Sequence, residues 1–294
     1  MSSFIQFELW KDCKQCCPFC CNRGQVPINK KESCEYVMEK LNTLTTKSYD
    51  YIGFIGGEFF NGELEGYLEQ FTAIINKANE LQPRKIFITS SLIFDAEKYL
   101  FPFLKSIPFR NKIVICTSWD AKYRFHTITQ QLQWAKNMLL LKNKFPEVEL
   151  HVEIILMQPF IDAVNNELIS LKLFRDIFKC SVDFIEPSSG LYFKDKYECQ
   201  EAIPGFFPTK KSFVQFLKNV KNDVDLNKLL SMDLRSEELY FIENGNRRVA
   251  KNRREGDGRC ELSDKTKQYD IGFIDSNDPM RKIVLQFKET LGEE

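Results

Sequence analysis

The sequence predicts an α/β fold, in which a parallel sheet is covered by helices. Strand-like and helix-like segments alternate six times over about 190 residues, an order typical of such folds. The strand-like segments are also apolar almost throughout, as in Lys112–Thr117 (KIVICT), which indicates burial on both faces of the sheet. Because right-handed crossovers connect parallel strands, the chain forms either a doubly wound sheet or a barrel.

The strands and helices follow one another along the first two thirds of the chain. The expected strands are Gln6–Trp10, Asp50–Ile55, Arg84–Thr89, Lys112–Thr117, Glu149–Met157 and Ser181–Ile185. The expected helices are Lys31–Thr46, Leu64–Leu81, Asp95–Leu104, Thr127–Asn143 and Asp162–Phe178, assigned mainly from apolar residues at helical spacing. In both candidate folds, functional residues lie at the carboxyl ends of the strands.

The sequence changes character after Gly190. Tyr192–Pro208 is irregular, and Thr209–Val220 has a helical pattern. Leu239–Val249 predicts a hairpin, because Asn-Gly is a favoured two-residue turn between strands. A short strand at Asp270–Ile274 and a helix at Met280–Leu291 are expected to follow. We therefore divide the chain into a main unit, residues 1–190, and a small α+β extension, residues 191–294.

Composition and charge exclude several classes of protein. The chain has 41 Lys and Arg and 41 Asp and Glu, so general electrostatic attraction to nucleic acid is not expected. No apolar run approaches the roughly 20 residues of a membrane span. The amino-terminal residues do not have the basic start and apolar run of a signal peptide, so we expect a cytoplasmic protein without a membrane partner.

The cysteines indicate metal or redox chemistry. Five of the ten fall within nine residues: Cys13, Cys16, Cys17, Cys20 and Cys21. Disulfides would have to close long loops, which such a cluster cannot do. Zinc knuckles need a spacer between the two pairs, and the ferredoxin run fails at Phe19. The spacing Cys13-x3-Cys17-x2-Cys20 suits three irons of a cubane cluster, with the fourth iron open to a ligand.

Two further motifs follow expected strands. Gly56-Gly57-Glu58 follows the second strand, and Ser118-x-Asp120 follows the fourth. The first motif is compatible with an ordinary tight turn, or with a backbone that approaches a ligand and accepts hydrogen bonds from an amine. The second is compatible with a helix cap, or with hydrogen bonds to ligand hydroxyls. Their position at strand ends, together with the cysteine loop after the first strand, favours a common site.

Other polar residues leave alternatives open. His151 and Glu153 share one face of the fifth strand, where they either point toward a substrate or form a satisfied polar pair. The basic run Arg247–Arg259 is either a solvated edge or a clamp for an acidic group. No nucleotide-phosphate loop and no serine-hydrolase elbow is present.

The chain resembles the radical S-adenosylmethionine (radical SAM) enzymes. The resemblance rests on Cys13-x3-Cys17-x-Phe19-Cys20, on Gly56-Gly57-Glu58 and on Ser118-x-Asp120, and it covers roughly residues 4–190. It implies a partial (β/α)6 barrel of the radical SAM type. Because such a barrel is open along one side and its radical must be kept from water, we expect the extension 191–294 to cover the lower or open side and to shape the substrate site. The resemblance also implies an enzyme in which a reduced [4Fe-4S] cluster cleaves S-adenosylmethionine (AdoMet), giving a 5′-deoxyadenosyl radical that abstracts hydrogen from a substrate.

The resemblance assigns roles to individual positions. Cys13, Cys17 and Cys20 would ligate the cluster, and Phe19 would pack near the adenine. The Gly56, Gly57 and Glu58 segment would hold the methionyl amine, while Ser118 and Asp120 would lie near the ribose or carboxylate. An electron donor such as flavodoxin or ferredoxin would be a partner. Only Cys199 and Cys260 lie in the extension, so no second cluster with four cysteine ligands is expected.

The substrate is open at this point, as is the identity of any catalytic residue. Peptides or proteins and nucleotide-type molecules are both compatible with the sequence. The competing class is a non-catalytic cysteine-rich protein that binds zinc or an electron-carrier cluster. A plain carrier cluster would need four protein ligands, whereas the cysteine loop favours three.

Overall fold

The structure is a computed structural model that describes residues 3–10, 12–15, 17, 29–60, 62, 66–120, 122–185, 208–224, 238–243, 246–251, 287 and 289–290. Its centre is one sheet with the strand order β6-β5-β4-β3-β2-β1-β7-β8, in which β7 spans Glu238–Glu243 and β8 spans Asn246–Lys251. The six predicted strands are present as β1 (Phe4–Glu8), β2 (Tyr51–Ile55), β3 (Lys85–Thr89), β4 (Ile113–Ser118), β5 (Glu149–Ile155) and β6 (Ser181–Ile185). Neighbours among these six strands are all parallel.

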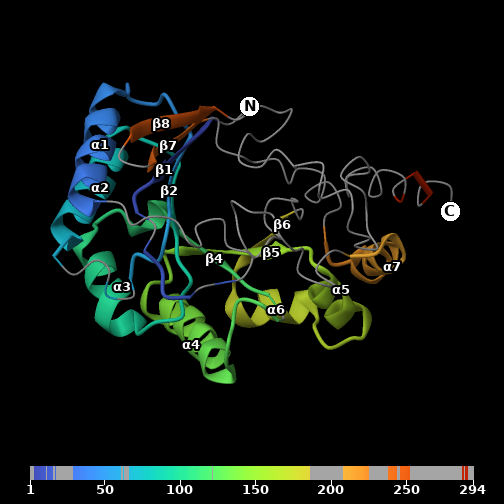
Figure 1. Cartoon of the computed structure of the whole chain (residues 1–294). Helices are drawn as coiled ribbons and strands as arrows, with labels where there is room; N and C mark the ends of the chain where they lie inside the picture. Colours follow the sequence, from blue (N-terminus) through green and yellow to red (C-terminus); the bar gives the residue numbers. More distant parts are fainter. Residues whose placement is uncertain are drawn as a thin grey trace.

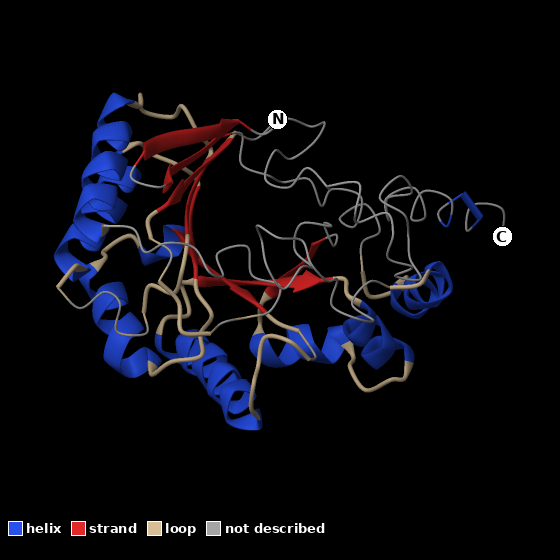
Figure 2. Ribbon diagram, in the orientation of Figure 1, coloured by secondary structure: helices blue, strands red, loops and turns tan. Residues whose placement is uncertain are grey.

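Helices cover the convex side of the curved sheet (Figure 1 and Figure 2). They are α1 (Lys30–Thr43), α2 (Leu68–Glu80), α3 (Ala96–Ser106), α4 (Ile128–Lys144), α5 (Gln158–Asn165), α6 (Leu171–Phe178) and α7 (Lys210–Val220), with a short 3₁₀ helix η1 (Arg110–Lys112) before β4. Polar side chains begin several of them: Asn29 accepts hydrogen bonds from the first turn of α1, and Thr127 caps α4. The sheet is not closed, so the predicted α/β class and partial barrel are confirmed.

The two faces of the sheet differ in chemistry, because alternate residues of a strand point to opposite sides. On the helix-facing side the strands carry Ile5, Phe7, Ile52, Phe54, Ile86, Ile88, Ile113, Ile115, Val152 and Ile154, each at most 1% exposed. On the concave side they carry Gln6, Glu8, Thr89, Ser118, His151, Glu153, Ser181 and Asp183. The core therefore lies between sheet and helices, and the concave face carries these polar residues alongside apolar ones such as Phe87 and Val114.

The predicted hairpin of the extension is confirmed and joins this sheet. β7 (Glu238–Glu243) pairs with β1 in parallel, and β8 (Asn246–Lys251) pairs with β7 in antiparallel. Arg247 extends toward α1, where its guanidinium forms an ion pair with Glu39 at 2.7 Å and lies 4.8 Å from the ring centroid of Tyr36. This first residue of the basic run thus belongs to the helix-covered side of the sheet.

One predicted helix is wrong in its bounds. Asp162–Phe178 was expected to be continuous, but the chain forms α5 and α6 with a break between them. Glu167 in the break has a left-handed backbone with φ of 59°, and Ser170 caps α6 by accepting a hydrogen bond from Leu173. The expected strand at 270–274 lies outside the described residues, as does the expected helix at 280–291 except at 287, 289 and 290. Within the described part of the chain, no helix is apolar and long enough to cross a membrane.

Candidate functional site

The carboxyl ends of β1 and β2 meet at the cysteine loop. β1 leads through Leu9 and Trp10 into this loop, of which residues 12–15 and 17 are described. Cys13 is half-buried and Cys17 is 6% exposed. Phe19 and Cys20 lie outside the described residues, so their assigned roles stay predictions.

The cysteine loop is bonded directly to the Gly-Gly-Glu segment. The Gly57 amide donates to the Trp10 carbonyl at 2.6 Å, and the Glu58 amide donates to the Asp12 carbonyl at 2.9 Å. A Cβ atom at Gly56 would lie 2.0 Å from the Trp10 carbonyl oxygen, and φ there is +145°. Both facts require glycine. The sequence predicted a close backbone approach at this position, and the described partner is the cysteine loop itself.

This packing predicts a large effect for Gly57→Ala. The new Cβ would lie 1.9 Å from the Asp12 carbonyl oxygen, so the cysteine loop would have to move. We expect a loss of about 1–3 kcal/mol in the free energy of unfolding, as for other overpacked sites, and a lower iron content after anaerobic reconstitution. Gly66→Ala is the control, because Gly66 has positive φ but no atom within 4 Å of the added Cβ. Equal iron content in both variants would contradict this role of Gly57.

Glu58 is buried and satisfied by protein donors. It is 0% exposed, and its carboxylate accepts hydrogen bonds from the Phe60 amide at 3.0 Å, the Ser90 hydroxyl at 3.1 Å and the Ser91 amide. Burial raises the pKa of Glu58, while these hydrogen bonds act in the opposite direction. The described contacts of this carboxylate therefore fix the loops after β2 and β3 to each other.

Ser90 and Ser91 were missed by the sequence analysis. They directly follow β3 and are buried, like the motifs that follow β2 and β4. The sequence feature that could have indicated them is a pair of serines at the carboxyl end of an apolar strand. Their role depends on a partner more than thirty positions away, which no local pattern contains.

Asp120 organises the loop after β4. One carboxylate oxygen, Oδ1, accepts hydrogen bonds from the amides of Lys122 at 2.8 Å, Tyr123 at 2.5 Å and Arg124 at 3.1 Å. The cap of the following helix is Thr127, so the helix-cap interpretation of Ser118 and Asp120 is wrong. Asp120 is 2% exposed, and its Oδ2 has no hydrogen-bond partner in the described structure. A buried carboxylate oxygen without a partner is costly, which favours a ligand donor at this position.

The loop after β4 also holds the cysteine loop. The His126 ring nitrogen Nε2 lies 2.5 Å from the Gln15 carbonyl oxygen, and the Gln130 amide reaches the Gln15 side chain at 3.5 Å. On the other side of the cysteine loop, Lys30 forms an ion pair with Asp12 at 3.3 Å. The cysteine loop is thus fixed from β2, from α1 and from the loop before α4.

Neighbouring groups affect the pKa of Cys13. Burial, with smaller contributions from Glu58 and Cys17, raises the pKa of the Cys13 thiol to about 11, although a backbone hydrogen bond from Gln15 and the charge of Arg124 act in the opposite direction. A thiol with this pKa is protonated near neutral pH, so a bound metal must displace its proton. Within the described ranges no group of three or more His, Cys, Asp or Glu side chains could hold a metal ion. Cys13 and Cys17 are two thiolate donors of a soft-metal site, and the predicted third donor, Cys20, is outside those ranges.

Comparisons with known proteins bear on the fold. No family model matches the chain. No curated protein matches it either. Among solved structures, it matches "Native anSMEcpe with bound AdoMet" with a TM-score of 0.53 and 16% identity, over 79% of this chain and 63% of that chain. It matches Streptococcus suis SuiB bound to S-adenosylmethionine with a TM-score of 0.51 and 10% identity, over 76% of this chain and 47% of that chain.

Both matched proteins are radical SAM enzymes. The chain described here therefore has the fold of radical SAM enzymes, as its resemblance to them implies. It spans less than two thirds of the length of either matched chain. Both matched structures contain bound AdoMet.

Proposed function

We propose that this protein is a radical SAM enzyme. The observation that carries the proposal is the direct bonding of the cysteine loop to the Gly-Gly-Glu segment, through the Gly57 and Glu58 amides. This contact joins two of the three sequence motifs at the carboxyl edge of a partial barrel. Asp120, from the third motif, adds a buried carboxylate oxygen whose partner is not among the described residues. The fold shared with two AdoMet-bound enzymes supports the same function.

Residues of the three motifs would hold a cluster and AdoMet. Cys13 and Cys17, together with Cys20, would hold a [4Fe-4S] cluster, which when bound supplies the electron that cleaves AdoMet to methionine and a 5′-deoxyadenosyl radical. Gly56, Gly57 and Glu58 would orient the methionyl amine, with Glu58 locked by Ser90 and Ser91. Ser118 and Asp120 would accept hydrogen bonds from ligand hydroxyls, and Phe19 would contact the adenine. The reaction class is set by the substrate.

Anaerobic reconstitution tests this proposal. The protein should bind about four irons, as a [4Fe-4S] cluster requires. With AdoMet and a chemical reductant or reduced flavodoxin, it should release 5′-deoxyadenosine and methionine in equal amounts. Iron is measured by metal analysis and the products by chromatography. Zinc in place of iron, or an intact cluster without AdoMet cleavage, would support the non-catalytic metal-binding class instead.

A further inference from the structure

A polar patch lies on the concave face of β4, β5 and β6, beside the site described above. The strand register places Ser118, Glu153 and Asp183 in one row across the three strands. His151 and Ser181 lie in the next row toward the amino ends of the strands. Neighbouring strands are about 4.8 Å apart, so Glu153 is one strand spacing from Ser118.

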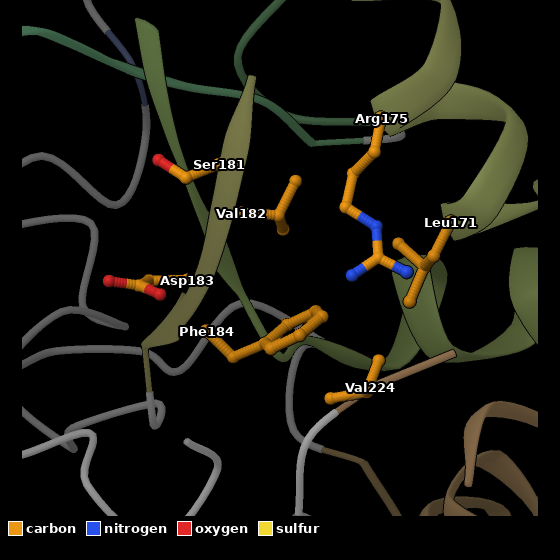
Figure 3. A pocket seen from close by; sticks show the side chains of 7 residues that line it. All are labelled: Leu171, Arg175, Ser181, Val182, Asp183, Phe184 and Val224. Atoms are coloured by element: carbon orange, nitrogen blue, oxygen red, sulfur yellow. The ribbon is translucent and has the colours of Figure 1, made fainter. Parts of the chain in front are cut away.

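Figure 3 shows how the side chains of β6 divide between its two sides. Ser181 and Asp183 point to one side, and Val182 and Phe184 point to the other, toward Arg175 and Leu171 of α6. The small pocket in this view, of about 110 Å³, is lined in part by these apolar residues. The polar side chains of β6 therefore face away from the helix layer, on the same side as those of β5.

His151 is held in place by two neighbours. Its Nε2 lies 3.2 Å from Asp183 Oδ2, and its Nδ1 lies 2.8 Å from the Ser181 hydroxyl. Both ring nitrogens are thus engaged. The Asp183 side chain remains 43% exposed, so it is accessible from the concave side while paired with His151.

Glu153 differs from its neighbours. In the described part of the chain its carboxylate has neither a hydrogen bond nor an ion pair, and the residue is half-buried. Burial raises the pKa of Glu153, and the nearby charge of Asp183 raises it as well. The charges of His151 and Arg124 lower this pKa. Arg124 acts on Cys13 as well, and its buried Nε has no described partner. A carboxylate in such surroundings is stabilised when a cationic hydrogen-bond donor binds to it.

We propose that Glu153, with the His151–Asp183 pair, forms the substrate subsite of this barrel and binds a cationic group, either a primary amine or a guanidinium. The inference rests on the proposed radical SAM function and adds a substrate class to it. Two carboxylates face one imidazole in the patch, and the charge of Arg124 also acts on Glu153, so the two carboxylates outnumber the one permanently charged cation near them. The nearest basic strand residue on this face, Lys85, lies at the amino end of β3 and is paired with Glu149 at 2.8 Å. A cation held at Glu153 places its neighbouring carbon atoms beside Ser118, one of the residues assigned to AdoMet.

The cationic group has two possible sources, which matched probes distinguish. Agmatine represents a free small cation. Acetyl-Ala-Lys-Ala-amide represents a peptide side chain, and the matching glutamine peptide is its uncharged control. Binding is measured by titration calorimetry on the anaerobic protein that carries its cluster and AdoMet. We expect agmatine or the lysine peptide to bind at least about tenfold more tightly than the glutamine peptide, the effect of one charge-assisted hydrogen bond. Binding of agmatine would indicate a free small cation as the substrate, and binding of the lysine peptide would indicate a peptide side chain.

Variants locate the binding to the patch. Glu153→Gln and Asp183→Asn should each reduce the preference for the cation about tenfold or more. Glu149→Gln, at the amino end of the same strand, should keep it. Iron content and thermal stability show whether each variant is folded. Equal binding of the lysine and glutamine peptides with no agmatine binding, or an unchanged preference in Glu153→Gln, would overturn the inference.

The outcome separates this inference from the proposed function. If the wild-type protein cleaves AdoMet but shows no preference for cations, the substrate subsite is wrong and the radical SAM function stands. If the protein holds a cluster but does not cleave AdoMet, the proposed function fails, and the inference fails with it.

Discussion

Replacing Cys13 or Cys17 with alanine should remove the cluster from anaerobically prepared protein and abolish AdoMet cleavage. Both cysteines lie on a loop that hydrogen bonds fix to the segment after β2 and to the loop before α4. Each assigned cysteine is the only protein ligand of one iron. Removing one cysteine therefore leaves the cluster attached to the protein by two bonds instead of three. We expect iron to fall from about four per chain to near zero, with the same result for Cys20→Ala.

Four other cysteines provide controls for this prediction. Cys16→Ala and Cys21→Ala remove thiols from the same stretch of sequence without removing an assigned ligand. Cys34→Ala and Cys180→Ala remove buried thiols elsewhere in the fold. Iron analysis and the visible absorption of the cluster should be largely unchanged in all four. Loss of iron in Cys16→Ala with retention in Cys17→Ala would show that the ligand register is different.

Local sequence patterns predicted most of the strands to within one or two residues at each end. β6 was predicted with the bounds Ser181–Ile185 that the structure has. The helix 162–178 failed because apolar spacing continues across Glu167, whose left-handed backbone ends the regular pattern. The pairing of β7 with β1 was not predicted, because it joins Ile5 to Glu238 across most of the chain. Apolar periodicity predicts elements, whereas such pairings depend on the whole fold.

The candidate site was predicted from the rule that functional residues lie at the carboxyl ends of parallel strands. That rule placed Gly56–Glu58 and Ser118–Asp120 at the same edge, and the structure places them there. It did not predict that His126 would hold Gln15, 111 positions away in the chain. It also did not predict the donors to Glu58. These supporting contacts pair residues of common types, and only their arrangement in space distinguishes them.

Glu58→Ala should weaken AdoMet binding and also destabilise the fold. The substitution leaves the Phe60 amide, the Ser90 hydroxyl and the Ser91 amide without their acceptor in a buried region. An unsatisfied buried donor costs about 1–3 kcal/mol, so we expect a loss on the order of 3 kcal/mol in the free energy of unfolding. Urea denaturation of the cluster-free protein measures this loss, with Glu69→Ala as the exposed control, expected to change stability by less than about 0.5 kcal/mol.

Glu58→Gln separates the structural role of Glu58 from its ligand role. Glutamine keeps the size of the side chain but replaces one acceptor oxygen with a donor, so it cannot accept hydrogen bonds at both Phe60 and Ser91. If Glu58 acts only within the protein, Ser90→Ala should lower stability while AdoMet affinity stays at the wild-type level, and Glu58→Gln should do the same. If Glu58 also contributes its charge to the methionyl amine, Glu58→Gln should lower AdoMet affinity about tenfold or more, beyond any effect of Ser90→Ala. We expect the second result, and equal AdoMet affinity in the two variants would contradict the ligand role of Glu58.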